Sequence, residues 1–241
     1  FDTDVDRVAI ISGSGKVISG TKLIAFVAKF VLKQYPHCVI VTDSMTYESL
    51  KGFIEKNGGH QFRYKRGYKN VINMAKKINE KGGNCPLAIE TSGHAAFKEN
   101  DFMDDGAYLA CKILVEILKI KNSGKTIENV IEELETPKGE LDIRIKIKDN
   151  LADVNKVMKD LSSHAKSSKS IKLDEENAEG VRIYFPSKQQ NGLILLRKSL
   201  HEPELVLHAE SYAQGGLRLI INYIRPFLKK YDFLNISELL I

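Results

Sequence analysis

Cys38-Val39-Ile40-Val41-Thr42 is a short apolar segment that lies between two stretches with helical periodicity. The stretch before it, about residues 21–34, carries apolar side chains on one helical face and ends ahead of Pro36. The stretch after it, about residues 46–57, has the same character and ends at Gly58-Gly59. A buried strand between two amphipathic helices is the repeating unit of an α/β domain.

The same alternation continues along the first half of the chain. Strands are predicted at about residues 60–64 and 87–89, with a helix between them that stops at Gly82-Gly83, and a further helix follows at about residues 105–121. Strands that alternate with helices form βαβ units, so we predict an α/β domain with a parallel sheet. Ligands of such sheets bind beyond the carboxyl ends of the strands, where a basic turn (65–70) and a polar loop (90–94) lie.

The pattern changes after Asn122-Ser123-Gly124, which we predict as the boundary between domains. Residues 141–147 alternate apolar and charged side chains, which is typical of a strand with one buried and one solvated face. Further helices are predicted at about residues 126–135, 150–163 and 212–230, a loop at 166–170, and strands at 181–185, 193–196 and 205–209. We therefore predict a smaller α+β domain with an antiparallel sheet.

Composition places the chain among ordinary soluble globular proteins. It has 241 residues, 43% hydrophobic and 28% charged, with no apolar run of the roughly 18 residues that a membrane span needs. The net charge of +5 is spread along the chain and does not form the basic stripe of a nucleic-acid-binding protein. Three cysteines, Cys38, Cys85 and Cys111, form no Cys-x-x-Cys pair and suggest a reducing, cytoplasmic compartment. The chain begins at Phe1, without a signal peptide, and we expect it to be a fragment.

The N-terminal segment carries three carboxylates, Asp2, Asp4 and Asp6, followed by Arg7. A tight loop can gather them around one divalent cation such as Mg²⁺, and the apolar residues 8–11 are predicted to anchor this loop as a buried strand. The fixed charge of Arg7 suits phosphate chemistry. A calcium loop of the EF-hand type is excluded, because its Gly and Glu positions hold Arg7 and Gly13. The alternative is an acidic surface turn.

Two further segments offer polar groups suited to a sugar phosphate. Glu90-Thr91-Ser92-Gly93-His94 presents a carboxylate, two hydroxyls and an imidazole at the end of a predicted strand. A carboxylate and a hydroxyl together can bind a vicinal diol, although Ser92 alone would suit a helix cap. The basic turn around Lys65 is the second segment, and a solvated run of charges is its alternative interpretation.

These segments resemble motifs of the phosphohexomutases, the phosphomannomutase and phosphoglucomutase superfamily. Asp2-x-Asp4-x-Asp6-Arg7 resembles the metal loop of that family, and Glu90-x-Ser92-Gly93-His94 resembles its sugar-binding loop. Lys65-Arg66-Gly67-Tyr68 is similar to its basic turn, and Asp104-Asp105-Gly106 is similar to a helix start, where we expect Asp105 to be an N-cap. The resemblance implies catalytic roles for Arg7, Lys65 and His94, with Lys65 contacting substrate and assisting proton transfer.

Arg197-Lys198-Ser199-Leu200-His201 resembles the phosphate loop of the family. Arg197 and Ser199 match its pattern, while Leu200 and His201 depart from it. Leucine restricts the backbone, and His201 would replace a lost hydroxyl contact, more strongly when protonated. His208 lies in a predicted strand, where we expect packing and not ligand binding.

The resemblance implies a C-terminal part of a phosphohexomutase, an isomerase that interconverts hexose 1- and 6-phosphates. In that family a phosphoserine passes its phosphoryl group to the sugar through a bisphosphate intermediate, with Mg²⁺. The chain would comprise the truncated end of a metal-binding domain (1–12), a sugar-binding α/β domain (13–124) and a phosphate-binding α+β domain (125–241). Its partners would be the hexose phosphate and upstream domains that carry the catalytic serine, so the fragment alone is expected to be inactive.

Two other functions fit parts of the sequence. Phe1-Asp2-Thr3-Asp4-Val5 resembles the motif of haloacid-dehalogenase-type phosphatases and mutases, with Asp2 as nucleophile, Asp4 as acid and Asp104-Asp105 as a late metal pair. That alternative leaves Asp6, Arg7 and the loop of residues 90–94 without a role. The other alternative is a non-catalytic subunit that binds a sugar phosphate.

Overall fold

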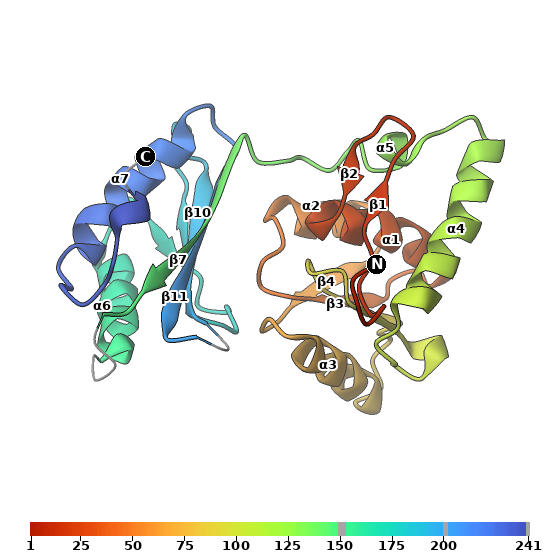
Figure 1. The fold of residues 1–241 in the computed structure, drawn as a ribbon, viewed down its shortest axis with the longest axis horizontal. Coiled ribbons are helices and arrows are strands. Elements are labelled where there is room, and N and C mark those ends of the chain that lie inside the picture. Colours follow the sequence, from red (N-terminus) through yellow and green to blue (C-terminus); the bar gives the residue numbers. More distant parts are fainter. Residues whose placement is uncertain (149–152, 200–201, 240–241) are drawn as a thin grey trace. The chain divides into compact units, whose positions relative to one another are not determined.

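The computed structural model describes residues 1–148, 153–199 and 202–239, and the chain divides into two compact units, Phe1–Glu135 and Thr136–Ile241 (Figure 1). The second unit begins later than the boundary expected near Gly124. The reason is that Ile127, Ile131 and Leu134 are buried in the hydrophobic core of the first unit. Only Ile127–Val130 of the helix expected at 126–135 is helical (α5).

A four-stranded sheet in the order β4-β3-β5-β6 forms the centre of the first unit. Its strands are β3 (Val39–Thr42), β4 (His60–Arg63), β5 (Leu87–Ile89) and β6 (Ala95–Phe97). β3 pairs in parallel with β4 and β5, which confirms the α/β prediction, and β6 runs antiparallel to β5 at the edge. β6 was not expected, because a three-residue strand that follows a glycine turn has no periodic signal.

Helices cover both faces of this sheet. α1 (Gly20–Gln34), α2 (Ser49–Lys56) and α4 (Gly106–Asn122) share one hydrophobic core with it, whereas α3 (Tyr68–Glu80) packs on a second core (Figure 1). Ile40 belongs to the first core and Val41 to the second, since successive residues of a strand point to opposite faces. A short 3-10 helix, η1 (Lys98–Asn100), precedes α4.

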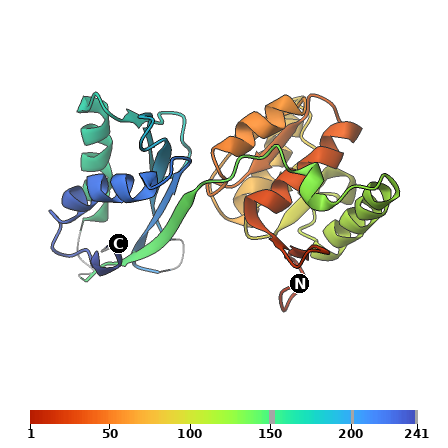
Figure 2. The ribbon, with the colours of Figure 1, turned by 90° about the horizontal axis from the view of Figure 1, so that it is seen from above.

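A small hairpin, β1 (Ile10–Ile11) and β2 (Val17–Ile18), lies beside the N-terminus (Figure 2). The prediction that residues 8–11 form a buried strand is wrong, because Val8 is buried but Ile11 is 75% exposed. A hairpin that packs through one face leaves its other face in solvent. The cross-strand pair Ile10 and Ile18 faces the core of the unit.

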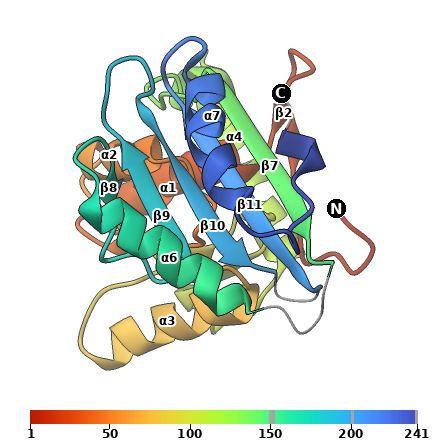
Figure 3. The ribbon, with the colours of Figure 1, turned by 90° about the vertical axis from the view of Figure 1, so that its left-hand side faces the viewer.

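The second unit contains a five-stranded antiparallel sheet in the order β7-β11-β10-β9-β8. Its strands are β7 (Gly139–Lys146), β8 (Lys172–Leu173), β9 (Val181–Phe185), β10 (Gly192–Lys198) and β11 (Glu204–Ser211). α6 (Val154–Ser167) and α7 (Gly216–Leu228) lie on one face of this sheet, as Figure 3 shows. Ile143 and Ile145 of β7 are buried there, so the predicted alternation and the α+β class are confirmed.

The ends of the helices in the second unit differ from those expected. α7 begins at Gly216 and not near residue 212, because Gly215 adopts a left-handed φ of 74° just before it. α6 extends to Ser167, into the predicted loop, and a short 3-10 helix, η2 (Ser237–Leu239), lies near the end of the chain. Among the described residues, no helix is both long enough and apolar enough to cross a membrane.

Candidate active site

The acidic residues at the N-terminus form a compact loop. Carboxylate oxygens of Asp2, Asp4 and Asp6 lie within 4.8 Å of one another. Val5 adopts a left-handed φ of 64°, and this turn folds the segment so that alternate residues converge, as they would not in a straight strand. Oδ1 of Asp6 is buried and makes no hydrogen bond to the described residues. Three convergent carboxylates with an unsatisfied oxygen fit a hard divalent cation such as Mg²⁺.

Arg7 stabilises this acidic loop from within. Its Nε donates to Asp2 Oδ2 at 2.5 Å, and its backbone N–H donates to Asp2 Oδ1 at 3.1 Å. Removal from water acts to raise the pKa of Asp2, but the hydrogen bonds from Arg7 outweigh it and lower this pKa to about 2. Asp2 is therefore ionised across the physiological range, and the predicted catalytic Arg7 here serves to neutralise part of the loop's charge.

The acidic loop is held against the segment that follows β5. Arg7 and His94 form an isolated antiparallel bridge, and the Val8 N–H donates to the carbonyl oxygen of Gly93 at 3.3 Å. Gly93 has a φ of 100°, and a Cβ there would lie 2.7 Å from the Val8 carbonyl oxygen. Glycine at this position therefore permits both the turn and the close approach of the N-terminal segment.

His94 connects the acidic loop to the start of α4. Its Nδ1 lies 2.8 Å from Asp104 Oδ2 and 3.7 Å from Asp6 Oδ1, and its ring stacks on Tyr68 at a centroid distance of 5.1 Å. Burial acts to lower the pKa of His94, but the hydrogen bond and charge of Asp104 outweigh burial and raise it. Asp105 accepts from the Tyr108 N–H at 2.8 Å, so its predicted role as the N-cap of α4 is confirmed.

Glu90 lies directly after β5 and is 3% exposed. Its Oε1 accepts from the Gly67 N–H at 2.6 Å and its Oε2 accepts from Ser92 Oγ at 3.1 Å. Burial, and then the charge of Asp43, raise the pKa of Glu90 to about 7. The sequence-predicted pair of Glu90 and Ser92 is thus brought together as one polar unit.

The basic turn lies beside this pair. The bond from Gly67 to Glu90 joins the loop after β4 to the loop after β5, and both loops follow parallel strands at their carboxyl ends. Lys65 is exposed at this turn. Three of the four predicted segments, the acidic loop, the basic turn and the loop of residues 90–94, therefore meet within the first unit.

The fourth predicted segment belongs to the second unit. Arg197 is 5% exposed near the end of β10, with its Nη1 3.8 Å from Glu179 Oε1 and 3.1 Å from the Lys198 carbonyl oxygen. The Ser199 Oγ accepts from the Glu202 N–H at 3.3 Å, which closes a turn. His201 and Leu200, which the sequence placed in the phosphate loop, lie outside the described residues.

His208 is packed in a strand, as expected, and it also contacts two carboxylates. It is 3% exposed in β11, and its Nδ1 lies 2.9 Å from Asp142 Oδ1 while its Nε2 lies 3.5 Å from Glu210 Oε2. Burial acts to lower its pKa, but the two carboxylates outweigh burial and raise this pKa to about 9. His208 is therefore a buried cation between two acids, which its place in a strand did not predict.

Sequence reasoning also missed Asp43, which is fully buried and accepts hydrogen bonds from Thr91. The available signal was its position directly after β3, at the same end of the sheet as the basic turn and Glu90. A carboxylate at the carboxyl end of a parallel strand lies where ligands bind in this fold class.

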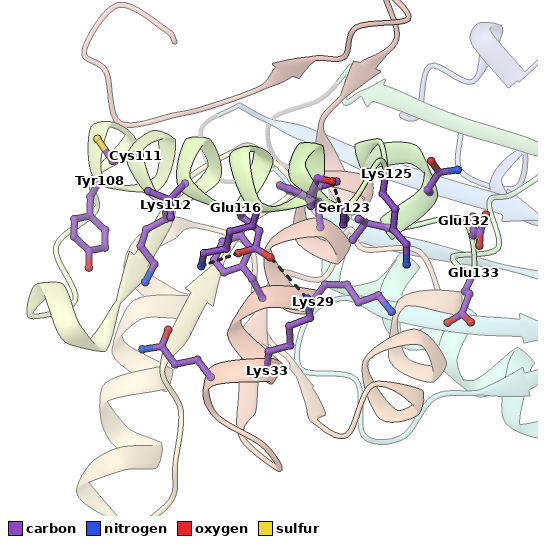
Figure 4. Close-up of a pocket in the computed structure, with 18 residues that line it drawn as sticks. Lys29, Lys33, Tyr108, Cys111, Lys112, Glu116, Ser123, Lys125, Glu132 and Glu133 are labelled. Atoms are coloured by element: carbon purple, nitrogen blue, oxygen red, sulfur yellow. Dashed lines mark hydrogen bonds and ion pairs between the residues drawn. The ribbon is translucent and has the colours of Figure 1, made fainter.

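A separate pocket of about 950 Å³ lies between α1 and α4 (Figure 4). It contains none of the predicted site residues, and most of its lysines contact neighbouring side chains. Lys33 and Lys119 both pair with Glu116, at 3.8 and 3.2 Å, and Lys112 pairs with Glu99 at 2.5 Å. We therefore assign the candidate active site to the strand ends and not to this pocket.

Comparison with known proteins gives a consistent picture. Residues 19–137 match the family profile described as phosphoglucomutase/phosphomannomutase, alpha/beta/alpha domain III. A phosphomannomutase/phosphoglucomutase of Pseudomonas syringae pv. tomato is 33% identical over 237 residues, which is 95% of this chain and 46% of that protein. A phosphomannomutase of Methanocaldococcus jannaschii is 27% identical over 232 residues, 96% of this chain and 47% of that protein. The chain spans about half the length of the curated relatives that it matches.

Solved structures share the fold. A phosphoglucomutase/phosphomannomutase family protein of Burkholderia thailandensis superposes with a TM-score of 0.76 at 24% identity, covering 95% of this chain and 45% of that one. An Aspergillus fumigatus N-acetylphosphoglucosamine mutase, solved with GlcNAc-6P and magnesium, has a TM-score of 0.61 at 14% identity, covering 95% of this chain and 51% of that one. At these identities the likeness concerns the fold alone.

Proposed function

This chain belongs to the phosphoglucomutase/phosphomannomutase family of the alpha-D-phosphohexomutase superfamily, and we propose that it forms the sugar- and phosphate-binding part of a phosphohexomutase. Such an enzyme interconverts hexose 1-phosphate and hexose 6-phosphate through a phosphoserine and a bisphosphorylated sugar. One observation carries the proposal: the acidic loop, the basic turn and the Glu90 loop meet within a single unit. The names of the relatives support the mutase class.

Asp2, Asp4 and Asp6 are the residues that would hold Mg²⁺. The three converge, and the buried Oδ1 of Asp6 makes no hydrogen bond to the described residues, which supports the assignment. A bound Mg²⁺ supplies positive charge that stabilises a phosphoryl group during transfer. Asp104-Asp105 does not favour the haloacid-dehalogenase alternative, because Asp105 caps α4 and Asp104 bonds His94.

The other residues would bind and orient the sugar phosphate. Glu90 and Ser92, already joined by a hydrogen bond, would hold two neighbouring sugar hydroxyls. Lys65 is exposed and would contact substrate and assist proton transfer. His94 would be a further catalytic residue, beside the acidic loop. Arg197 and Ser199 of the second unit would hold the phosphate that does not react, a role that suits the planar, multi-donor guanidinium of arginine.

Replacement of Asp4 by asparagine tests the proposed metal site. Asp4→Asn removes one anionic ligand without removing the Asp2 contacts of Arg7, so the affinity for Mg²⁺ should fall about tenfold. The measurement is a calorimetric Mg²⁺ titration of the 241-residue chain. Glu132→Gln removes an exposed carboxylate of the same unit and should leave the affinity unchanged. Equal Mg²⁺ affinity in wild type and Asp4→Asn would exclude this site.

The chain on its own should not turn over substrate. We propose that the phosphoserine lies upstream, because Ser12 and Ser14 lie in the β1–β2 hairpin loop, after the acidic loop, where the Ser14 hydroxyl donates to Glu128. The purified chain should therefore convert no glucose 1-phosphate in the presence of Mg²⁺ and a hexose bisphosphate. Measurable turnover would contradict this prediction. The positive control is a full-length relative, which contains the half that this chain does not span.

A further inference from the structure

Asp43 is a buried carboxylate that has no place among the proposed substrate contacts. It directly follows β3 and has no exposed surface. Its Oδ2 accepts from the Thr91 Oγ at 2.6 Å, and its Oδ1 accepts from the Thr91 N–H at 3.3 Å. Both oxygens therefore fix one residue, and that residue lies between Glu90 and Ser92.

Two adjacent residues of this loop are held by segments that follow two different strands. Thr91 is held by Asp43, from the loop after β3, and Glu90 is held by the Gly67 N–H, from the turn after β4. Residues 90–93 form a turn that is closed by the Gly93 N–H donating to the Glu90 carbonyl oxygen at 3.0 Å, so fixing Thr91 also fixes the turn that carries Glu90 and Ser92. The ends of three parallel strands are thereby linked through the loop that follows β5.

We propose that Asp43 is a positioning residue that acts through Thr91 to set the orientation of Glu90 and Ser92 for binding the hydroxyls of a sugar phosphate. This inference rests on the proposed function. Aspartate suits the role because an ionised carboxylate accepts two hydrogen bonds from one residue. An asparagine would offer a single acceptor oxygen and no charge.

The charges around Glu90 make this role measurable. Asp43 repels negative charge on Glu90, while Arg66 in the basic turn attracts it, and Glu90 in turn interacts with His94. Removing the charge of Asp43 should therefore make Glu90 easier to ionise. This charge acts through space, so the Glu90 titration tests the electrostatic effect of Asp43, and removal of the Thr91 hydroxyl, which keeps the charge, tests the positioning.

The experiment follows the Glu90 carboxyl by carbon-13 NMR during a pH titration of the 241-residue chain. Asp43→Asn should lower the Glu90 pKa by about one unit, since a like charge close by is worth one unit or more. Thr91→Ser keeps the hydroxyl and should leave the pKa unchanged. An unchanged Glu90 titration in folded Asp43→Asn would overturn the proposal.

Thr91→Val provides a second test if Asp43→Asn does not fold. It has nearly the shape of threonine but lacks the hydroxyl, so the affinity for hexose 6-phosphates of mannose, glucose and N-acetylglucosamine should fall about tenfold. Thr91→Ser should retain the affinity, and Thr126→Val, which removes the capping hydroxyl of α5, is the control. Equal affinities in Thr91→Val and wild type would overturn the proposal.

Failure of the proposed function gives a different result. A wild-type chain that binds none of the three hexose phosphates would contradict the proposed sugar site. The Glu90 titration does not depend on a ligand, so it still decides whether the charge of Asp43 acts on Glu90.

Discussion

Replacement of Gly106 by alanine should displace the acidic loop and weaken Mg²⁺ binding by about tenfold. Gly106 is the first residue of α4 and is buried. A Cβ at this position would lie 2.5 Å from the Val5 carbonyl oxygen and 2.9 Å from the backbone carbon of Asp6. Both are main-chain atoms, so no side-chain rotation relieves the contact, and the segment that carries Asp4 and Asp6 must move.

Gly106→Ala tests steric crowding by the new methyl group alone, because it adds no backbone strain. The φ of Gly106 lies outside the left-handed region, so alanine suits the helix and only the neighbouring loop opposes it. Overpacking of this kind costs about 1–3 kcal/mol when the neighbours stay in place. A loop that moves away instead avoids that cost and loses its contacts with His94, which join it to the site.

Gly52→Ala is the matched control. Gly52 lies inside α2, and a Cβ there would meet nothing within 4 Å. Alanine should stabilise this helix by about 0.5–1 kcal/mol and leave Mg²⁺ binding unchanged. Calorimetric titration and thermal unfolding of both variants check the pair. A Gly106→Ala chain that binds Mg²⁺ as tightly as wild type would show that Mg²⁺ binding does not depend on the close packing of the acidic loop against Gly106.

The elements with strong periodicity were predictable from the sequence. The strand at residues 39–42, its flanking helices and the alternating strand at residues 139–146 follow from local patterns of apolar side chains. The edge strand β6 and the exposed side of the β1–β2 hairpin did not follow. Their structure depends on what packs against them, and such contacts join residues distant in the sequence.

The candidate site shows the same division. The types of residue at Asp2, Asp4, Asp6 and Glu90 pointed to a cation and a sugar, because their chemistry is readable from composition and spacing. The residues that contact these site residues could not be predicted from the sequence. Asp43 lies 48 positions before Thr91, and His208 lies 66 positions after Asp142, so only the fold brings these groups together. Burial and the charge of Asp43 raise the pKa of Glu90, whereas Asp142 and Glu210 raise the pKa of His208 against the effect of burial.

Glu90→Gln should stabilise the chain at pH 8 by on the order of 3 kcal/mol and have a much smaller effect at pH 4. Burial raises the pKa of Glu90 to about 7 from an ordinary value of 4.5. The folded chain therefore binds this proton more tightly than the unfolded chain does. The resulting stabilisation is complete below about pH 4.5 and is lost as the pH rises through 7.

Glutamine keeps an oxygen that can accept from the Gly67 N–H, so the variant removes the cost of ionisation without leaving that donor unpaired. Urea unfolding of wild type and variant between pH 4 and 9 measures the difference. His94 and His208 also have raised pKa values, and stability from both is lost as the pH rises, but they are present in both chains. Subtracting the two curves therefore leaves chiefly the titration of Glu90.

Glu128→Gln is the control with the opposite sign. Hydrogen bonds from Ser12 and then Ser14 lower the pKa of Glu128 to about 2, so its contribution is present above about pH 4.5 and is lost only as the pH falls towards 2. Its difference curve should be flat between pH 5 and 9. A flat curve for Glu90→Gln as well would mean that Glu90 is already ionised in the folded chain at pH 5, and that a cation or water offsets its burial.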